Sequence, residues 1–140
     1  MPGDVIIGYD GSEGSKKALA AAVELAGALQ RKLVIAYAYE VSAFGGEVQD
    51  LAKALREQGE GVLEEANATA KAAGLDPETA VISGDRAEAL ANLAAERGAG
   101  LVVIGSRGES TLKGLVLGSV THKLLHLSAA PVLVVPVHDA

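Results

Sequence analysis

Two glycine-containing segments in the last third of the chain carry residues that could bind a phosphate group. Gly105-Ser-Arg-Gly108 follows an apolar run, and nine residues later Gly118 and Ser119 precede a helical pattern. The glycines allow close backbone approach and offer amide donors, and the start of a helix favours an anion. The Ser119 hydroxyl and the charges of Arg107 or Lys113 would add to this site. Each glycine alone could serve a turn, and Ser119 a helix cap, but their joint placement favours phosphate binding.

The elements that must position these residues follow from the alternation of apolar and polar positions. We expect five strands, over residues 4–9, 33–38, 79–83, 101–104 and 131–137. We expect four helices, starting after Ser12, covering residues 48–73, running from Gly84-Asp85 to Arg97, and covering residues 119–127. Gly59 and Gly61 lie inside the second helix, and because glycine weakens helices they predict a bend there.

Strands that alternate with helices predict a mostly parallel sheet with helices on both faces. The first and fourth strands are continuously apolar and fit central positions, whereas Glu78 and Ser83 in the third and Pro136 in the fifth indicate edges. The strand order 3-2-1-4-5 satisfies these conditions. Its topological switch lies between strands 1 and 4, where open α/β sheets bind ligands. We therefore expect residues 1–140 to form a single α/β domain, an open five-stranded parallel sheet.

Composition and charge argue against several classes of protein. There is no cysteine, which excludes disulfides and thiolate metal sites. The net charge of −6 argues against nucleic acid as a partner. The apolar runs 101–104 and 129–135 are far shorter than the roughly 20 residues of a membrane span. Residues 1–4 contain no basic segment of the kind that opens a signal peptide, so we expect a cytoplasmic protein.

The spacing Gly105-x2-Gly108-x9-Gly118-Ser119 matches the G-x2-G-x9-G-[ST] nucleotide motif of the universal stress proteins. The chain resembles this family over nearly its whole length, with residues 42–74 the least diagnostic part. The segments that carry the resemblance are residues 5–19, 101–108 and 118–136. The resemblance implies a Rossmann-like fold of the adenine nucleotide alpha hydrolase-like type.

The resemblance also implies an ATP site at the carboxyl ends of strands 1 and 4, with Mg²⁺ as a companion ion. Carried over by position, the nucleotide-binding residues are Asp10, Gly11, Ser12, Ala38, Ile104, Gly105, Arg107, Gly108, Gly118, Ser119, Val120 and Thr121. Ala38 and Ile104 would line the adenine pocket, and Asp10 could hold Mg²⁺ through water. Some relatives carry His where this chain has Arg107. The sequence does not choose between ATP, AMP and a cyclic nucleotide.

The expected function is that of a nucleotide-dependent regulatory protein in stress response, acting on a protein partner that the sequence does not name. No residue at the predicted site is recognisable as a general base, so we expect at most slow ATP hydrolysis. One alternative is a dimeric interaction module in which the nucleotide is incidental. The apolar strand from Pro131 to Val137 would pair there, and the family resemblance also implies such dimers. A nucleotidyl- or phosphoryl-transfer enzyme is the third candidate.

Two other sites compete with the phosphate site. Gly8, Gly11 and Gly14 follow the first strand, but a dinucleotide site would require G-x-G-x-x-G rather than their G-x2-G-x2-G spacing. His122 and His126 are four residues apart and share a helix face, but no third zinc ligand is evident.

Overall fold

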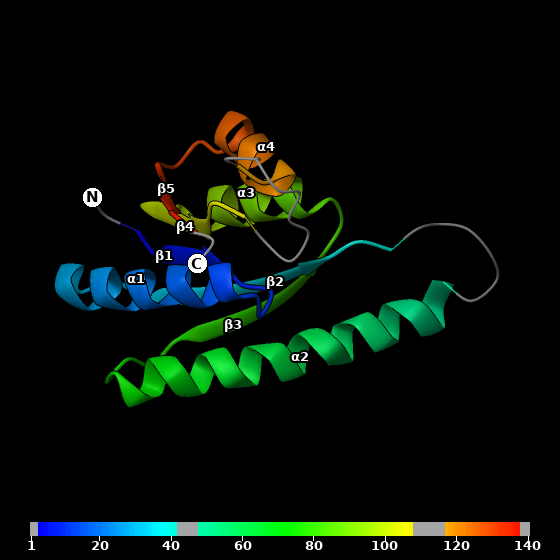
Figure 1. Ribbon diagram of the computed structural model, residues 1–140, viewed down its shortest axis with the longest axis horizontal. Coiled ribbons are helices and arrows are strands. Elements are labelled where there is room, and N and C mark those ends of the chain that lie inside the picture. Colours follow the sequence, from blue (N-terminus) through cyan, green and yellow to red (C-terminus); the bar gives the residue numbers. More distant parts are fainter. Residues whose placement is uncertain (1–2, 42–47, 108–116, 138–140) are drawn as a thin grey trace.

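The computed structural model describes residues 3–41, 48–107 and 117–137. Strands and helices alternate along them as the sequence predicts (Figure 1). The strands are β1 (Val5–Gly8), β2 (Leu33–Tyr39), β3 (Glu78–Ser83), β4 (Leu101–Gly105) and β5 (Val132–Val135). The helices are α1 (Glu13–Leu29), α2 (Val48–Ala72), α3 (Arg86–Arg97) and α4 (Ser119–Leu127).

The five strands form one parallel sheet in the order β3-β2-β1-β4-β5, which confirms the predicted order. Val5 of β1 pairs with Leu33 of β2 on one side and with Leu101 of β4 on the other. The chain thus leaves β1 in one direction across the sheet and returns to β4 on its opposite side. The chain leaves the carboxyl ends of β1 and β4 toward opposite faces of the sheet, to α1 and α4, and such a switch point is where a crevice forms.

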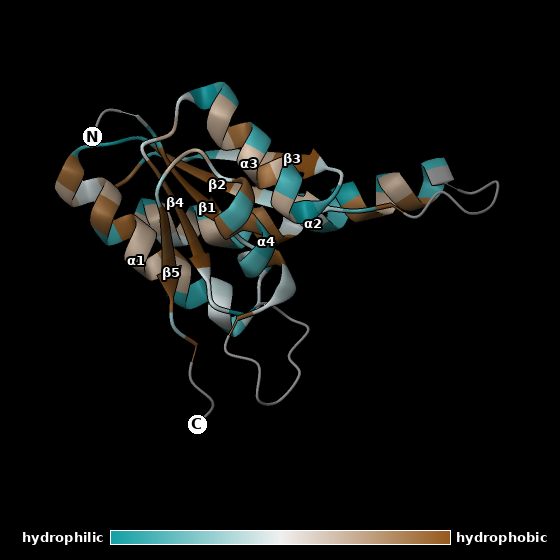
Figure 2. Ribbon diagram, turned by 90° about the horizontal axis from the view of Figure 1, so that it is seen from above, coloured by the Kyte–Doolittle hydropathy of each residue, from teal (hydrophilic) through white to brown (hydrophobic). Residues whose placement is uncertain are grey.

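The helices cover both faces of the sheet, with α1 and α2 on one face and α3 and α4 on the other (Figure 1). Alternate residues of each strand point to opposite faces. Val5 and Ile7 therefore pack in the α1–α2 layer, and Ile6 packs in the α3–α4 layer. Figure 2 shows the hydrophobic strands enclosed between these helices. The residues that the helices contribute are mostly alanines and leucines: Ala18, Leu19, Ala22, Ala26, Leu63, Ala66 and Ala70 in the first layer, and Ala87, Leu90, Ala91, Ala94 and Leu124 in the second.

Local signals in the sequence set the helix ends. The side chain of Ser12 accepts a hydrogen bond from the backbone N–H of Ser15, and so caps α1 as predicted. Asp85 caps α3 in the same way, and Gly98 ends α3 in the left-handed conformation. Gly74, with φ of +90°, follows the end of α2. These short-range contacts explain why the predicted boundaries differ from the observed ones by only a residue or two.

Helix α2 is one unbroken element across Gly59 and Gly61, so the two glycines that predict a bend do not interrupt the helix. The two glycines have different surroundings. A Cβ on Gly59 would meet the ring of Tyr37, whereas a Cβ on Gly61 would meet nothing within 4 Å. Gly59 therefore allows α2 to lie close to β2, and packing outweighs its low helix propensity.

The edges of the sheet are β3 and β5, as the polar residues of β3 and Pro136 predicted. Pro136 lies just beyond the last residue of β5, where the strand no longer needs its N–H. Within the described ranges, no helix has both the length and the apolar character needed to cross a bilayer.

Candidate functional site: a pocket between strands 1 and 4

A pocket lies at the carboxyl ends of the strands, where the topological switch predicts a ligand site. Its walls come from the ends of β1, β2 and β4 and from the starts of α1, α3 and α4. The residues that line it are Gly8, Tyr9, Asp10, Ser12, Ser15, Ala36, Ala38, Arg86, Leu90, Ile104, Gly105, Arg107, Gly118, Ser119, Val120 and Thr121.

Most of the residues selected from the sequence meet in this pocket. The ten that line it are Asp10, Ser12, Ala38, Ile104, Gly105, Arg107, Gly118, Ser119, Val120 and Thr121. Gly11 is not part of the lining. Its φ of +85° forms the turn after β1, and its missing Cβ would face Val62 of α2. Gly108 and Lys113 lie outside the described residues.

The start of α4 opens into the pocket without a side-chain cap. Its N-cap residue is Gly118, which has no side chain to accept from the first-turn N–H groups, and the first turn contains no acidic residue. By contrast, α1 and α3 are capped by Ser12 and Asp85. Because an uncapped helix start combines free N–H donors with the positive end of the helix dipole, this wall can hold an anion.

Two hydrogen bonds hold the start of α4 against β4. The Thr121 hydroxyl donates to the Gly105 carbonyl at 2.8 Å, and this bond is buried. The Gly118 N–H donates to the Ser106 carbonyl at 2.7 Å. The helix start is therefore fixed relative to the end of β4, so its free N–H groups are positioned before any ligand arrives.

Gly105 has a packing role that the sequence did not indicate. A Cβ on Gly105 would lie 2.9 Å from the Gly14 carbonyl oxygen, and a Cβ on Gly14 would overlap the Arg107 carbonyl oxygen. The two glycines therefore let the first turn of α1 lie directly on the end of β4. This close contact explains why position 14 is glycine, so a dinucleotide site is not needed to explain it.

Arg107 lines the pocket but is only 6% exposed. Its Nη2 donates to the Val137 carbonyl at 3.0 Å, while the Val137 N–H donates to Oγ of Ser106 at 2.8 Å. Residues 106 and 107 thus hold the segment that follows β5. A contact between Arg107 and a phosphate, which the sequence predicts, would compete with the hydrogen bond from Arg107 to the Val137 carbonyl.

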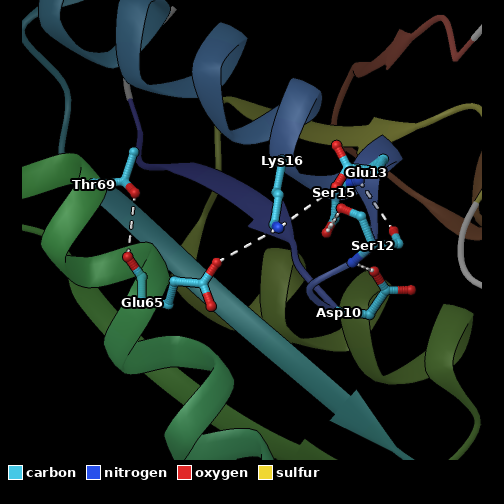
Figure 3. A network of polar contacts seen from close by, with 7 residues as sticks. All are labelled: Asp10, Ser12, Glu13, Ser15, Lys16, Glu65 and Thr69. Carbon is cyan, nitrogen blue, oxygen red and sulfur yellow. Dashed lines mark hydrogen bonds and ion pairs between the residues drawn. The ribbon is translucent and has the colours of Figure 1, made fainter.

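Asp10 supplies the carboxylate on the pocket wall. Its Oδ1 accepts a hydrogen bond from the Ser12 N–H at 2.9 Å, which places it beside the cap of α1 (Figure 3). On the far side of that turn, Lys16 of α1 lies 3.8 Å from Glu65 of α2 and links the two helices (Figure 3). The turn after β1 is therefore held by the bond between Asp10 and the Ser12 N–H, next to the start of α1.

Tyr9 is buried, and its side chain packs in the α1–α2 layer. Burial raises the pKa of its phenol above the ordinary value of 10.0, and the carboxylates of Glu65 and Asp10 raise it further. The phenol therefore stays protonated at neutral pH.

The opposite end of the pocket is apolar. Ala36 and Ala38 are two residues apart on β2 and so share a face, and Leu90 and Ile104 complete the surface. Gly8 leaves room for Leu90, since a Cβ there would lie 2.9 Å from Leu90 Cδ1. A flat apolar group fits this end, and an anionic group fits the start of α4.

Comparison with known proteins identifies the family. The family model described as the universal stress protein family matches residues 1–136. The chain belongs to the universal stress protein family. Universal stress protein YxiE of Bacillus subtilis (strain 168) is 37% identical over 143 residues, which cover 94% of this chain and 97% of YxiE.

Solved universal stress proteins share the fold. A universal stress protein crystallised in complex with cAMP is 34% identical, with a TM-score of 0.76 and full coverage of both chains. The universal stress protein from Archaeoglobus fulgidus in complex with dAMP has a TM-score of 0.73 over 95% of this chain and 97% of that chain. At 17% identity, this second likeness shows the fold alone.

The universal stress protein motif did not point to every residue of the pocket. The lining residues that the motif did not name are Gly8, Tyr9, Ser15, Ala36, Arg86 and Leu90, of which Gly8 was considered only for a dinucleotide site. Ala36 could have been found from Ala38, because residues two apart on a strand share a face. Arg86 and Leu90 belong to α3, which follows the edge strand β3 rather than a strand at the switch. Only the packing of α3 over β2 and beside α4 brings them to the pocket.

The two histidines of α4 contact each other through their rings. The ring centroids of His122 and His126 lie 4.9 Å apart in an edge arrangement. Across the parts of the chain that the structure describes, no three His, Cys, Asp or Glu side chains group closely enough to hold a metal. The histidine pair thus gains no third ligand there.

Proposed function

We propose that this protein binds an adenine nucleotide in the pocket between β1 and β4 and acts as a nucleotide-dependent regulatory protein. The observation that carries the proposal is the uncapped start of α4, fixed by Thr121 and Gly118 and facing an apolar surface that includes Ala38 and Ile104. An adenine base matches the apolar end, and phosphates match the free N–H groups of the helix start.

The solved relatives support this choice of ligand. The relative at 34% identity was crystallised with cAMP, and the Archaeoglobus fulgidus neighbour with dAMP. Both ligands are adenine nucleotides, which favours the base over other purines and pyrimidines. Within the proposal we name ATP as the physiological ligand, and AMP and cAMP are the competitors that the experiment below compares with it.

Mg²⁺ would enter with the nucleotide rather than bind by itself. Asp10 is the carboxylate of the lining, and one carboxylate with ligand phosphates is a common way to hold Mg²⁺. The Asp10 side chain already accepts a bond from the Ser12 N–H through Oδ1, which leaves Oδ2 for a Mg²⁺-bound water. No lining residue is placed as an evident general base for attack by water, so the proposal includes at most slow ATP hydrolysis.

Thermal melting with ATP, AMP and cAMP, each with Mg²⁺, tests the binding proposal. A ligand at 100 times its dissociation constant adds about 2.7 kcal/mol to the free energy of unfolding. We expect the largest shift with ATP. No shift with any nucleotide at millimolar concentration would refute binding.

Gly118→Asp tests the position of the phosphates. Gly118 has φ of −70°, which aspartate adopts readily, so the new carboxylate can cap α4 in place of a ligand anion. We expect the nucleotide-free variant to melt at or above the wild-type temperature while the nucleotide shift is lost. Gly61→Asp places the same side chain in open space on α2 and is the matched control. A full nucleotide shift in Gly118→Asp would exclude α4 from the site.

We further propose a homodimer that pairs through β5, within the predicted strand from Pro131 to Val137. β5 is an edge strand of four partly exposed apolar residues. The Pro131 carbonyl accepts a bond from Val102 of β4, and the Val135 carbonyl accepts one from Ser106, just after β4. The N–H of Val134, between them, therefore faces the free edge. Val134→Pro would remove this donor without breaking the contact with β4.

Light scattering during size-exclusion chromatography tests the dimer. The wild type is expected at twice the 14.1 kDa monomer mass, and Val134→Pro at the monomer mass with an unchanged circular dichroism spectrum. A monomeric wild type at micromolar concentration would refute the dimer and, with it, the interaction-module alternative. The expected cytoplasmic location and the regulated protein partner remain predictions.

A further inference from the structure

Arg86 is an exposed cation on the wall of the pocket, at the first residue of α3. Its neighbour Asp85 does not neutralise it, because that carboxylate accepts bonds from the Glu88 N–H and from Lys123 Nζ, each at 3.0 Å. Within residues 3–41, 48–107 and 117–137, Arg86 has no ion-pair or hydrogen-bond partner for its side chain. Its guanidinium is therefore available to a ligand.

The fold places Arg86 at the apolar end of the pocket. Leu90, one helical turn further along α3, is part of the apolar surface, and residues four apart share a helix face. The Gly84 N–H donates to the Tyr39 carbonyl at 3.0 Å, which holds the connection between β3 and α3 beside the end of β2. Arg86 thus lies on the side of the pocket formed by β2 and Ala38.

The anion-binding end of the pocket is the start of α4, which is tied to β4. The starts of α3 and α4 lie near each other, since Lys123 Nζ of α4 is 3.0 Å from the Asp85 carboxylate, beside Arg86. A phosphate on α4 is therefore the competing partner of Arg86, and the titration below distinguishes it from the base.

We propose that the Arg86 guanidinium stacks on the exposed face of the nucleobase and closes the apolar end of the pocket. The inference rests on the proposed nucleotide binding. A guanidinium is planar and weakly hydrated, so it stacks on aromatic rings, whereas the ammonium of lysine is a compact point charge. In this arrangement Ala36, Ala38 and Leu90 contact the base from inside the pocket, and Arg86 covers it from the solvent side.

Calorimetric titration with adenosine, AMP and ATP tests the contact, using the wild type, Arg86→Ala and Arg86→Lys. A stacking contact with the base lowers the affinity for all three ligands by the same factor, about tenfold in Arg86→Ala. Arg86→Lys keeps the charge and is expected to lose nearly as much. Lys53→Ala removes an exposed cation from α2, away from the pocket, and should bind like the wild type.

The outcomes separate this inference from the proposed function. A loss that increases from adenosine to ATP would assign Arg86 to the phosphates and overturn the stacking contact. Unchanged affinities in Arg86→Ala would also overturn it while leaving nucleotide binding intact. A wild type that binds none of the three ligands would overturn both proposals. Melting temperatures of the unliganded variants should match the wild type, because Arg86 is exposed and makes no contact within the described residues that its loss would break.

Discussion

Gly59 of α2 lies so close to Tyr37 of β2 that a Cβ on the glycine would be 2.5 Å from Cδ1 of the ring. Gly59→Ala is therefore expected to destabilise the protein by about 1–3 kcal/mol, since the added methyl forces the helix away from the sheet. The free energy of unfolding from urea titration measures the effect.

Gly61→Ala in the same helix is expected to act in the opposite direction. A Cβ at this position meets no atom within 4 Å, so the substitution gains helix propensity without a clash. We expect the free energy of unfolding to rise by about 0.5–1 kcal/mol. Urea titrations of the two variants form a matched pair, and a shared sign of the change would contradict the packing role of Gly59.

Gly8→Ala is expected to weaken nucleotide binding more than it weakens the fold. The new methyl would lie 2.9 Å from Leu90 Cδ1, and since that methyl is the end of a flexible side chain, Leu90 can move toward the pocket. Titration with ATP should show at least about a tenfold loss of affinity. Gly27→Ala in α1 is the control, because the nearest atom to its Cβ is 4.0 Å away. Equal affinities in the two variants would remove Leu90 from the binding surface.

Thr121→Val removes the hydroxyl that ties α4 to the end of β4. The substitution keeps the shape of the side chain but leaves the buried Gly105 carbonyl without this donor. We expect a loss of about 1–3 kcal/mol in the free energy of unfolding. Thr69→Val removes an exposed hydroxyl that bonds the Glu65 carbonyl within α2, and should change stability little. If both variants unfold at the same urea concentration, the Thr121 bond does not hold α4.

Asp85 is expected to make stability depend on acid pH. The Glu88 backbone N–H and the Lys123 ammonium hold the pKa of the Asp85 carboxyl below its ordinary value of 3.8. A lowered folded-state pKa contributes stability above the unfolded value, and that contribution is lost as pH falls through the folded value. Wild-type protein should therefore lose more stability than Asp85→Asn between pH 7 and pH 3.

Asparagine still caps a helix, so this comparison isolates the charge of Asp85 from its cap. Glu24→Gln is the control, because Glu24 is exposed on α1. Denaturation midpoints at the two pH values measure the difference. The same acid loss in wild type and Asp85→Asn would show that the ion pair with Lys123 contributes nothing to stability.

The fold was predictable because its main signals are local or continuous along the chain. The uninterrupted apolar runs of β1 and β4 indicated central strands, and Pro136 indicated an edge. Ser12 and Gly98 marked helix ends by contacts within one turn. The packing role of Gly59 was not predicted, because helix propensity alone does not show that Tyr37 faces this glycine.

The pocket was predictable only in part, for a related reason. The motif named residues on segments that follow β1 and β4, and the topology places these ends together. Arg86 and Leu90 come from a helix after an edge strand, so only three-dimensional packing shows that they share the pocket. The packing role of Gly105 could not be predicted from the sequence either, because the residue that it contacts, Gly14, lies about ninety residues earlier in the chain.

The residues that line the pocket come from segments near both ends of the sequence, and this has a consequence for folding during synthesis. Tyr9 to Ser15 supply one wall, whereas Gly118 to Thr121 supply the other, more than a hundred residues later. A growing chain that has not yet released α4 from the ribosome therefore lacks the helix start that would receive phosphates. A nucleotide that binds here cannot guide the early folding of the nascent chain. It can bind only chains whose translation has passed the start of α4.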